Sequence, residues 1–452
     1  MTDSIATPPP EGLRDHVTRT LRLAWPLILS RIGITLMATV DVLVLGRAGA
    51  DELSRYVLGF TLYDTLAAVL AGFVLGVAVL TARETGAERP RVAATIWHRG
   101  ALTGLALAVA IAAGLQFAEP LLLLTGQTAE MAASSASVTR IVVLALPAVA
   151  LFMATTTFLE ALHRPKIGLV AVAIANVNNL WLNIVLVFGA GPIPALGAEG
   201  AAWATVINLT LGTLGLWLYA RFVMADRKQF GIGEARPSAP PGLWEQTRIG
   251  VAAATAYAFE AGAFMVMTIM AGWLGPLALA VQGVVFSLLA TAFMIAFGLA
   301  NAAQVRVGNA WGRRDPKGMV LAGWTALGLA TLFTGTIMVA SLIFPEEIIR
   351  IFTDDPVLIA AALPVLLWVS LALVLDGAQT VMSHSCRGRG DAWMPSILHF
   401  GSYWLVMVPV AYWLAIVRDG GVAGLFQGIL VASLVSLAAL SIRFQVLSRR
   451  PV

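Results

Sequence analysis

The chain has 452 residues, of which 59% are hydrophobic and only 12% are charged. A soluble domain is about half apolar and about a quarter charged, so this composition excludes an ordinary soluble protein and predicts a polytopic membrane protein. The net charge of +4 is typical of basic loops on the inner side of a membrane, so it does not by itself indicate nucleic-acid binding.

Apolar runs long enough to cross a bilayer follow one another along the chain. A spanning helix needs roughly 20 apolar residues, and by that measure we predict about twelve spans. They lie near residues 21–46, 56–82, 97–118, 137–161, 167–189, 199–223, 247–274, 278–303, 319–344, 357–384, 394–416 and 422–445. The preceding segment, 1–20, lacks the apolar core of a cleavable signal peptide and is predicted to be a polar tail.

Basic residues alternate between the loops on the two sides of the membrane. One set of loops carries most of them: Arg14, Arg19, Arg22, Arg83, Arg89, Arg91, Arg99, Arg164, Lys166, Arg221, Arg227, Lys228, Arg236, Arg248, Arg306, Arg313, Arg314, Lys317, Arg387, Arg389, Arg443, Arg449 and Arg450. The opposite set carries little beyond Arg47, Arg55, Arg140, Arg350 and Arg418. Because basic loops stay in the cytoplasm, this asymmetry predicts that both termini are cytoplasmic.

The two halves of the chain resemble each other. A shift of 226 residues aligns several glycines, with Gly46 on Gly272, Gly72 on Gly298 and Gly86 on Gly312. Each half has an even number of spans, so both halves enter the membrane from the same side. This relation predicts a pseudo-twofold axis along the membrane normal, as in transporters built from parallel repeats.

The sequence therefore predicts an all-α integral membrane protein with two lobes around a central cleft. The polar, Pro/Gly-rich segment that begins at Met224 separates six spans from six. We assign residues 1–223 to an N-terminal lobe, 224–243 to a cytoplasmic linker and 244–452 to a C-terminal lobe.

Three Gly/Arg-rich stretches follow the second, eighth and tenth spans. They read LTARETGAERP (Leu80–Pro90), QVRVGNAWGRRDP (Gln304–Pro316) and SCRGRGDAWMP (Ser385–Pro395). These stretches resemble the signature loops of the multidrug and toxic compound extrusion (MATE) family, although Trp311 and Arg313 depart from the family pattern. We expect them to be hinge loops held at the inner membrane surface by their arginines, not binding sites.

Four acids lie within predicted spans, where a charge is costly: Asp41, Asp64, Glu260 and Asp376. Arg31 is the one basic residue deep in a predicted span, and it lies about 15 Å along the helix from Asp41. Few basic residues are therefore available to form a structural ion pair with these acids. These acids are expected to take up a proton, coordinate a small cation or face water.

Glu260 and Asp376 are the strongest candidates for a cation site. Glu260 lies about halfway along its span, where burial favours the neutral acid, so the group could alternate between two charge states. The MATE resemblance is closest to the bacterial NorM-like branch, because both acids occupy the places of that branch's acidic pair. The resemblance implies that this pair binds H⁺ or Na⁺ and that Asp41 contributes to coupling or to binding a cationic substrate.

Other polar and aromatic residues supply weaker candidates. The resemblance places Gln282 at the central cleft, and Tyr257, Phe259 and Phe286 could form aromatic walls for flat cations. Each aromatic residue could equally belong to the core or face lipid. Asp64 stays open between a cavity-lining acid and a local hydrogen-bonded one. A further acid, Glu160, is spaced to pair with His163 and Arg164 on the same helix.

These features predict a secondary antiporter that exports organic, mainly lipophilic cationic drugs in exchange for H⁺ or Na⁺. The resemblance implies a multi-pass protein of the bacterial inner membrane that confers drug resistance. None of the lysines follows the Gly-rich run of a nucleotide-binding loop, so we expect neither ATP nor another cofactor, and no nucleic acid. A closed two-lobe chain favours a monomer.

Two other functions are weaker. A flippase for lipid-linked precursors, from the related superfamily, would need a cationic cleft, and Arg31 is the one deep cation. An intramembrane enzyme would need grouped metal ligands or a nucleophile pair. His399 stands alone in its span, His384 lies at a cytoplasmic end, and the single cysteine, Cys386, excludes a cysteine-based metal cluster. The sequence therefore does not predict an enzyme.

Overall fold

The computed structural model describes residues 13–124, 128–234 and 242–450, and the elements within these ranges are helices. Twelve helical stretches there are long and apolar enough to cross a membrane, which confirms the predicted number of spans. Most extend beyond the predicted limits, because the helices continue through polar residues at their ends. The first helix begins at Leu13, inside the predicted polar tail. Residues 1–12 and 235–241, the latter in the predicted linker, lie outside the described residues.

Each lobe contributes six spans, some of them built from two consecutive helices. The helices of the first half are α1 (Leu13–Ala48), α2 (Ala50–Val74), α3 (Gly76–Gly86), α4 (Ala93–Gly114), α5 (Ala118–Leu124), α6 (Ala129–Val142), α7 (Leu146–Ala161), α8 (Pro165–Phe188) and α9 (Gly197–Leu218). Those of the second half are α10 (Leu243–Trp273), α11 (Pro276–Gly312), α12 (Pro316–Ile343), α13 (Pro345–Arg350), α14 (Pro356–Gly388), α15 (Trp393–Phe400), α16 (Val408–Tyr412) and α17 (Gly421–Arg449). The π-helical segments η6 (Gly401–Met407) and η7 (Trp413–Val417) flank α16.

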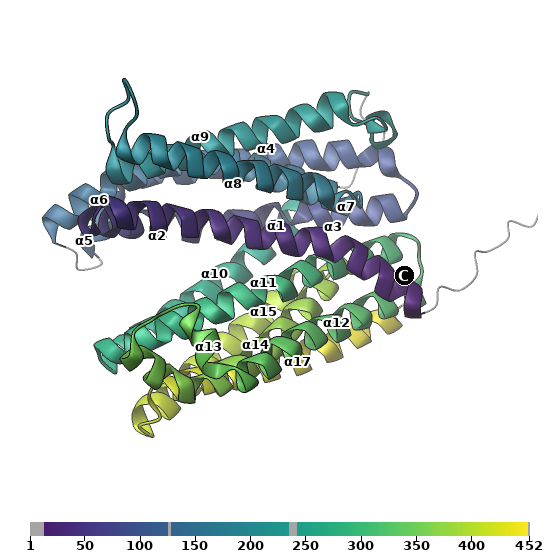
Figure 1. Ribbon diagram of the computed structural model, residues 1–452. Coiled ribbons are helices and arrows are strands. Elements are labelled where there is room, and N and C mark those ends of the chain that lie inside the picture. Colours follow the sequence, from purple (N-terminus) through teal and green to yellow (C-terminus); the bar gives the residue numbers. More distant parts are fainter. Residues whose placement is uncertain (1–12, 125–127, 235–241, 451–452) are drawn as a thin grey trace, which may run out of the picture.

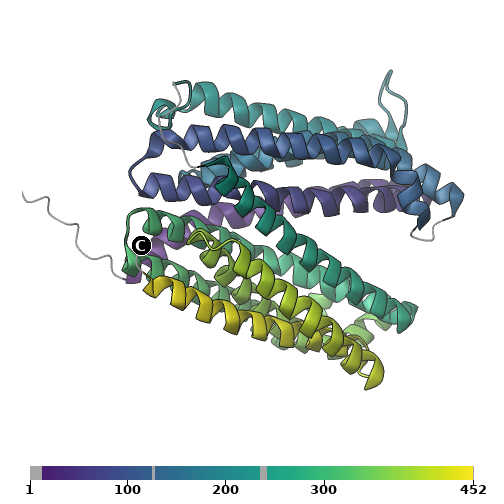
Figure 2. The same cartoon turned by 180° about the vertical axis from the view of Figure 1, so that it is seen from behind.

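The helices pack as two bundles that follow the two halves of the chain (Figure 1). One buried apolar cluster, around Val369 and Phe426, lies wholly in the second half, and another, around Leu45 and Val142, lies wholly in the first. The start of α1 and the end of α17 lie at the same end of the molecule, which we call the termini end. The bundles touch there and separate toward the opposite end (Figures 1 and 2).

Glycines allow the two lobes to approach each other closely at the termini end. A Cβ on Gly86 of α3 would overlap the backbone carbonyl of Asn309 in α11. A Cβ on Gly312 of α11 would overlap the backbone carbonyl of Arg83 in α3. The second contact repeats the first, because each of its residues is matched at an offset of 226. The predicted repeat is therefore expressed as a pseudo-twofold contact between the lobes.

The first helix of each lobe also crosses onto the other lobe. Ile28 of α1 lies against Gly298 of α11, and at the same offset Ala254 of α10 lies against Gly72 of α2. As a result α1 packs on α11 and α12, while α10 packs on α2 and α3. Figure 2 shows α10 running diagonally from one bundle to the other.

A single glycine makes the turn between the first two helices of each lobe. Gly49 separates α1 from α2 with φ 135°, and Gly275 separates α10 from α11 with φ 107°. Residues with a Cβ rarely adopt these angles, so both turns require glycine. The two positions are again 226 residues apart.

The three signature stretches are mostly helical, so the prediction that they form surface loops is wrong. Their first residues complete α3, α11 and α14, and the connecting loops that follow are short. Arg306 and Arg387, expected at the membrane surface, are 9% and 1% exposed. The physical reason is that glycines draw these helix ends together and enclose the side chains between them.

Candidate functional site

A cavity of about 310 Å³ opens among α10, α11, α14 and α15 of the C-terminal lobe, and we call it the C-lobe cavity. Both acids of the predicted cation site, Glu260 and Asp376, line it. The seventh and tenth spans therefore bring the two carboxylates to one space, as the sequence predicted. Among the other residues of its wall are Tyr257, Phe264, Phe286, Phe293, Phe297, Thr380, His384, Arg387 and His399.

Asp376 is buried and held by hydroxyl and amide donors. Its Oδ1 accepts hydrogen bonds from the hydroxyl of Tyr403 at 2.9 Å, from Nε2 of Gln379 at 3.2 Å and from Oγ of Ser433 at 3.3 Å. These donors come from η6, α14 and α17, so three elements fix the carboxylate. Such bonds stabilise a buried carboxylate without adding a fixed positive charge.

Glu260 is less constrained than Asp376. It lies partly buried on α10, and in the described part of the chain neither an ion pair nor a hydrogen bond holds its carboxylate. Arg387 lines the same cavity, and its charge attracts Glu260 without forming a direct pair. The C-lobe cavity thus contains a carboxylate that is free to take a ligand.

Arg387, His384 and His399 are wall residues that the sequence reasoning missed. Thr380, His384 and Arg387 follow Asp376 on α14 at four, eight and eleven residues, which places all four on one face of the helix. This spacing on one helix could have indicated from the sequence that His384 and Arg387 share a face with Asp376. Arg387 is a buried cation at the end of α14, and its guanidinium lies 5.9 Å from the ring of Tyr257.

The predicted substrate contacts fall into two groups. Tyr257 and Phe286 line the C-lobe cavity. Gln282 is buried outside its wall, where Nε2 donates to the Thr268 hydroxyl at 3.2 Å. Phe259 also lies outside the wall and packs against Phe400, with the two rings tilted by 52° and their centres 4.8 Å apart.

A second cavity, of about 250 Å³, lies in the N-terminal lobe, and we call it the N-lobe cavity. Asp41 of α1 lines it and is 3% exposed. Asp41 Oδ2 accepts a hydrogen bond from the Tyr56 hydroxyl at 2.8 Å. Its Oδ1 accepts from Nδ2 of Asn179 at 3.0 Å and of Asn183 at 2.7 Å. The asparagine-rich fifth span thus supplies two of the three donors.

The two cavities meet at α2. Ala68 belongs to the walls of both, and Asp64, one turn earlier, lines the N-lobe cavity. Asp64 is therefore a cavity-lining acid. Together the two cavities contain four carboxylates from four helices.

Glu160 has a different partner from the one its spacing predicts. It lies 3.5 Å from Arg31 of α1, so the two deep ions neutralise each other across helices. His163 instead lies 3.0 Å from Oδ1 of Asn309, and Arg164 pairs with Asp226. The predicted pairing of Glu160 with His163 at i+3 and Arg164 at i+4 is wrong, because the helix ends at Ala161 and the two basic residues turn away with the loop.

The arrangement in the C-lobe cavity offers oxygen ligands without a transition-metal site. Two carboxylates and the Thr380 hydroxyl line it, and such hard oxygens suit H⁺ or a small cation such as Na⁺. Within the described residues, no three His, Cys, Asp or Glu side chains are grouped for a metal ion.

Known proteins resemble this chain over nearly all of its length. The sequence profile of the MatE family matches residues 26–185 and 252–413, one segment in each lobe. A probable multidrug resistance protein NorM of Caulobacter vibrioides is 35% identical over 95% of this chain and 91% of its own length. The multidrug resistance protein NorM of Burkholderia vietnamiensis is 32% identical, over 97% and 95%.

Solved structures share the fold. The eukaryotic MATE transporter AtDTX14 superposes with a TM-score of 0.84 at 20% identity, covering 97% of this chain and 98% of its own. A MATE family multidrug resistance transporter in an outward-facing conformation gives 0.86 at 19% identity, covering 96% and 97%. Because the family profile spans both lobes and NorM proteins are more than 30% identical along almost the whole chain, this protein belongs to the MATE family of transporters, in its NorM-like branch.

Proposed function

We propose that the protein is a multidrug efflux antiporter that exchanges organic cations for H⁺ or Na⁺. The observation that carries the proposal is the C-lobe cavity, where Glu260 and Asp376 face one space and Glu260 has no ion pair or hydrogen bond to the residues that the structure describes. A charge in a membrane interior is expensive, so an acid left in this position needs an exchangeable positive ligand.

The exchange follows from competition for these carboxylates. When the coupling ion binds, it neutralises the acids and weakens their attraction for a cationic substrate in the space between the lobes. Each ligand also favours the lobe arrangement to which it binds more tightly, so binding of one drives release of the other.

The cavity walls suit a lipophilic cation. Tyr257 and Phe286 present aromatic rings beside the two acids, and Arg387 supplies one positive charge against two carboxylates. A flat cation gains from both the rings and the residual negative charge. The NorM relatives carry the name multidrug resistance protein, which supports a broad range of substrates. Gln282 and Phe259 lie outside the cavity wall, so the proposal does not depend on them.

We further propose that the termini end faces the cytoplasm of a bacterial inner membrane. The basic loops of the chain lie on that side, as the charge rule for membrane proteins requires. With the termini end closed, this arrangement corresponds to the outward-facing state. Each chain contains both cavities, so a monomer suffices as the functional unit.

Transport in proteoliposomes tests the proposal, with Na⁺ and pH gradients imposed separately and a fluorescent lipophilic cation as substrate. We expect one gradient to drive uptake by the wild type, and the Glu260→Gln and Asp376→Asn variants to lose that ion dependence. Glu130→Gln, which neutralises an exposed carboxylate, is the matched control. If both cavity variants pump like the wild type under either gradient, the assignment of the ion site is wrong.

A further inference from the structure

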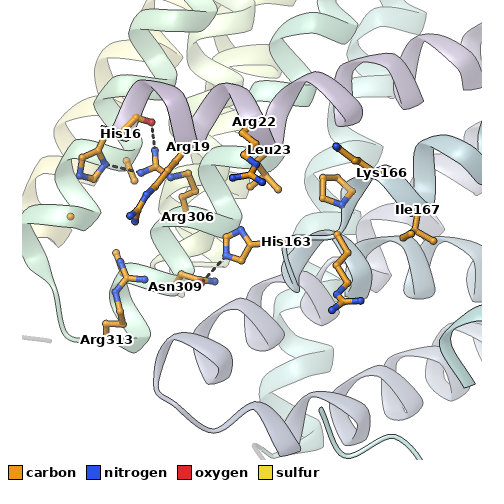
Figure 3. Close-up of a pocket in the computed structure, with 15 residues that line it drawn as sticks. His16, Arg19, Arg22, Leu23, His163, Lys166, Ile167, Arg306, Asn309 and Arg313 are labelled. Atoms are coloured by element: carbon orange, nitrogen blue, oxygen red, sulfur yellow. Dashed lines mark hydrogen bonds between the residues drawn. The ribbon is translucent and has the colours of Figure 1, made fainter. Parts of the chain in front are cut away.

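A larger pocket, of about 650 Å³, lies at the termini end between the two lobes (Figure 3). Its wall combines the start of α1 and the α7–α8 loop of the N-terminal lobe with the end of α11 and the start of α12 of the C-terminal lobe. It is separate from both cavities described above, since no wall residue is shared.

The wall of this pocket is strongly basic. Its cationic side chains are Arg19, Arg22, Arg164, Lys166, Arg306 and Arg313, and no carboxylate of the described residues belongs to it. Acids compensate part of this charge, since Arg164 pairs with Asp226 and Arg313 lies 3.9 Å from Asp315.

Arg306 bridges the lobes within the wall. It donates to the backbone oxygen of His16 at 3.0 Å, lies 2.7 Å from the His16 ring Nδ1, and contacts the Thr20 hydroxyl. Figure 3 shows Arg306 and His16 together, with Arg22 and Lys166 further along the pocket.

Arg22 and Lys166 carry the uncompensated charge. Neither forms an ion pair with a carboxylate in the described part of the chain, and both side chains are exposed. Lys166 rests over the ring of Trp25 at 5.6 Å, which leaves its ammonium donors available.

The helix α8 adds to the positive field. It starts at Pro165, next to the pocket, and no side chain caps its first turn. The unpaired N–H groups of a helix start attract anions, phosphates in particular. The pKa of His163, in the preceding loop, is consistent with this positive field. Desolvation lowers the pKa of this histidine, its hydrogen bond to Asn309 Oδ1 opposes that shift, and the charges of Arg306, Arg313 and Arg19 lower the pKa further.

We propose that this pocket binds a phosphate-bearing anion, either the headgroup of an acidic phospholipid or a soluble phosphate compound. Several guanidinium groups, a lysine and an uncapped helix start converge on one space, a combination that matches the charge and oxygen geometry of phosphate. The volume accommodates a phosphodiester headgroup with its neighbouring groups.

Such an anion would hold the lobes together at the termini end. The wall places Arg22 and Lys166 of the N-terminal lobe opposite Arg306 and Arg313 of the C-terminal lobe. Rocking the lobes apart would separate these groups, so the bound anion would favour the closed arrangement seen here. Binding of the anion does not depend on the proposed exchange of cations, whereas its effect on transport rests on that proposed function.

The test compares the Arg22→Gln/Lys166→Gln double variant with the wild type in lipid nanodiscs. The matched control is Lys228→Gln/Arg248→Gln, which removes the same charge from two exposed residues outside the pocket. In the first arm, pyrophosphate is titrated by calorimetry in nanodiscs of phosphatidylcholine alone. In the second, nanodiscs contain an equal share of phosphatidylglycerol, and native mass spectrometry counts the lipids that remain bound.

We expect at least one arm to show binding that the double variant weakens by about tenfold or more and that the control retains. Loss of pyrophosphate binding identifies a soluble ligand, and loss of retained phosphatidylglycerol identifies a lipid headgroup. The proposal is overturned if neither ligand binds the wild type, or if the double variant and the control bind equally. Because neither arm measures transport, failure here leaves the proposed antiport untouched.

Discussion

Each cavity holds one acid with three hydrogen-bond donors and a second acid that forms neither an ion pair nor a hydrogen bond in the described part of the chain. The pairs are Asp41 with Asp64 in the N-terminal lobe and Asp376 with Glu260 in the C-terminal lobe, where the cavity wall also contains a cation, Arg387. The repeat does not relate these acids. The residue 226 positions after Asp41 is Met267, and the residue 226 positions before Glu260 is Ile34. The backbone of the two lobes is duplicated, but their charged chemistry is not.

We propose that the two lobes divide the work of transport between them. The glycine contacts between the lobes are symmetric, because the pseudo-twofold packing of Gly86 and Gly312 needs the same small residues on both sides. Ion binding does not require symmetry, since one ion site is enough to couple ion movement to substrate transport. We therefore expect ion dependence to reside in the C-lobe cavity, and Asp41 to act mainly on the substrate.

The largest expected effect is a difference in ion-driven transport between variants of Asp376 and variants of Asp41. Asp376→Asn should reduce ion-driven transport by about two orders of magnitude, because loss of a charged ligand costs up to roughly 3 kcal/mol. Asp41→Asn should raise the substrate KM and leave the half-saturating concentration of the coupling ion unchanged. Initial rates measured over a matrix of ion and substrate concentrations check both. Equal loss of ion dependence in both variants would contradict the division.

The symmetric contact can be broken from either side. Gly86→Ala and Gly312→Ala should each destabilise the protein by about 1–3 kcal/mol, because the added methyl group overlaps a backbone carbonyl of the other lobe. The pseudo-twofold relation predicts similar values for the two. Thermal unfolding in detergent measures them.

Gly46→Ala and Gly272→Ala serve as the matched control for that pair. These helical glycines occupy repeat-related positions and have nothing within 4 Å of an added Cβ. They should be neutral or slightly stabilising, since alanine favours a helix over glycine. If they destabilise as much as the interface pair, the close packing between lobes is not the cause.

Arg387 allows a further comparison of the two cavities, because the described wall of the N-lobe cavity contains no cation. Arg387→Gln should lower the half-saturating concentration of the coupling ion by about tenfold, since a nearby positive charge opposes binding of another. Ion titrations of transport measure this shift, and Arg248→Gln, at an exposed position, should leave it unchanged. A shift toward weaker ion binding would show that Arg387 has another role.

The smallest expected effect concerns the tyrosines that donate to the acids. Tyr403→Phe and Tyr56→Phe each remove one hydrogen bond to a buried carboxylate, worth about 1 kcal/mol. Tyr403→Phe should shift the coupling-ion titration about threefold to tenfold, while Tyr56→Phe should alter the substrate KM instead. Tyr412→Phe, at an exposed ring, controls for the substitution itself. Interchanged effects would assign ion binding to the N-terminal lobe.

The sequence by itself determined the twelve spans, the repeat and the acids inside the membrane. Spans are set by the length of apolar runs, because the bilayer has a fixed thickness. The repeat can be recognised in the sequence because the turns at Gly49 and Gly275 accept no other residue without strain, so the glycine recurs at the same position of each half. The convergence of Glu260 and Asp376 also followed from the sequence, though through family resemblance and not through spacing.

Only the tertiary structure decided which charges meet. Arg31 pairs with Glu160 across 129 residues, Arg387 turns into the C-lobe cavity, and the basic pocket at the termini end takes its wall from four segments of the chain. Periodicity along one helix shows which face a residue occupies, but not which helix covers that face. Contacts between helices depend on how the lobes pack. Small residues such as Gly86 permit close packing, but they do not determine which helix packs against them.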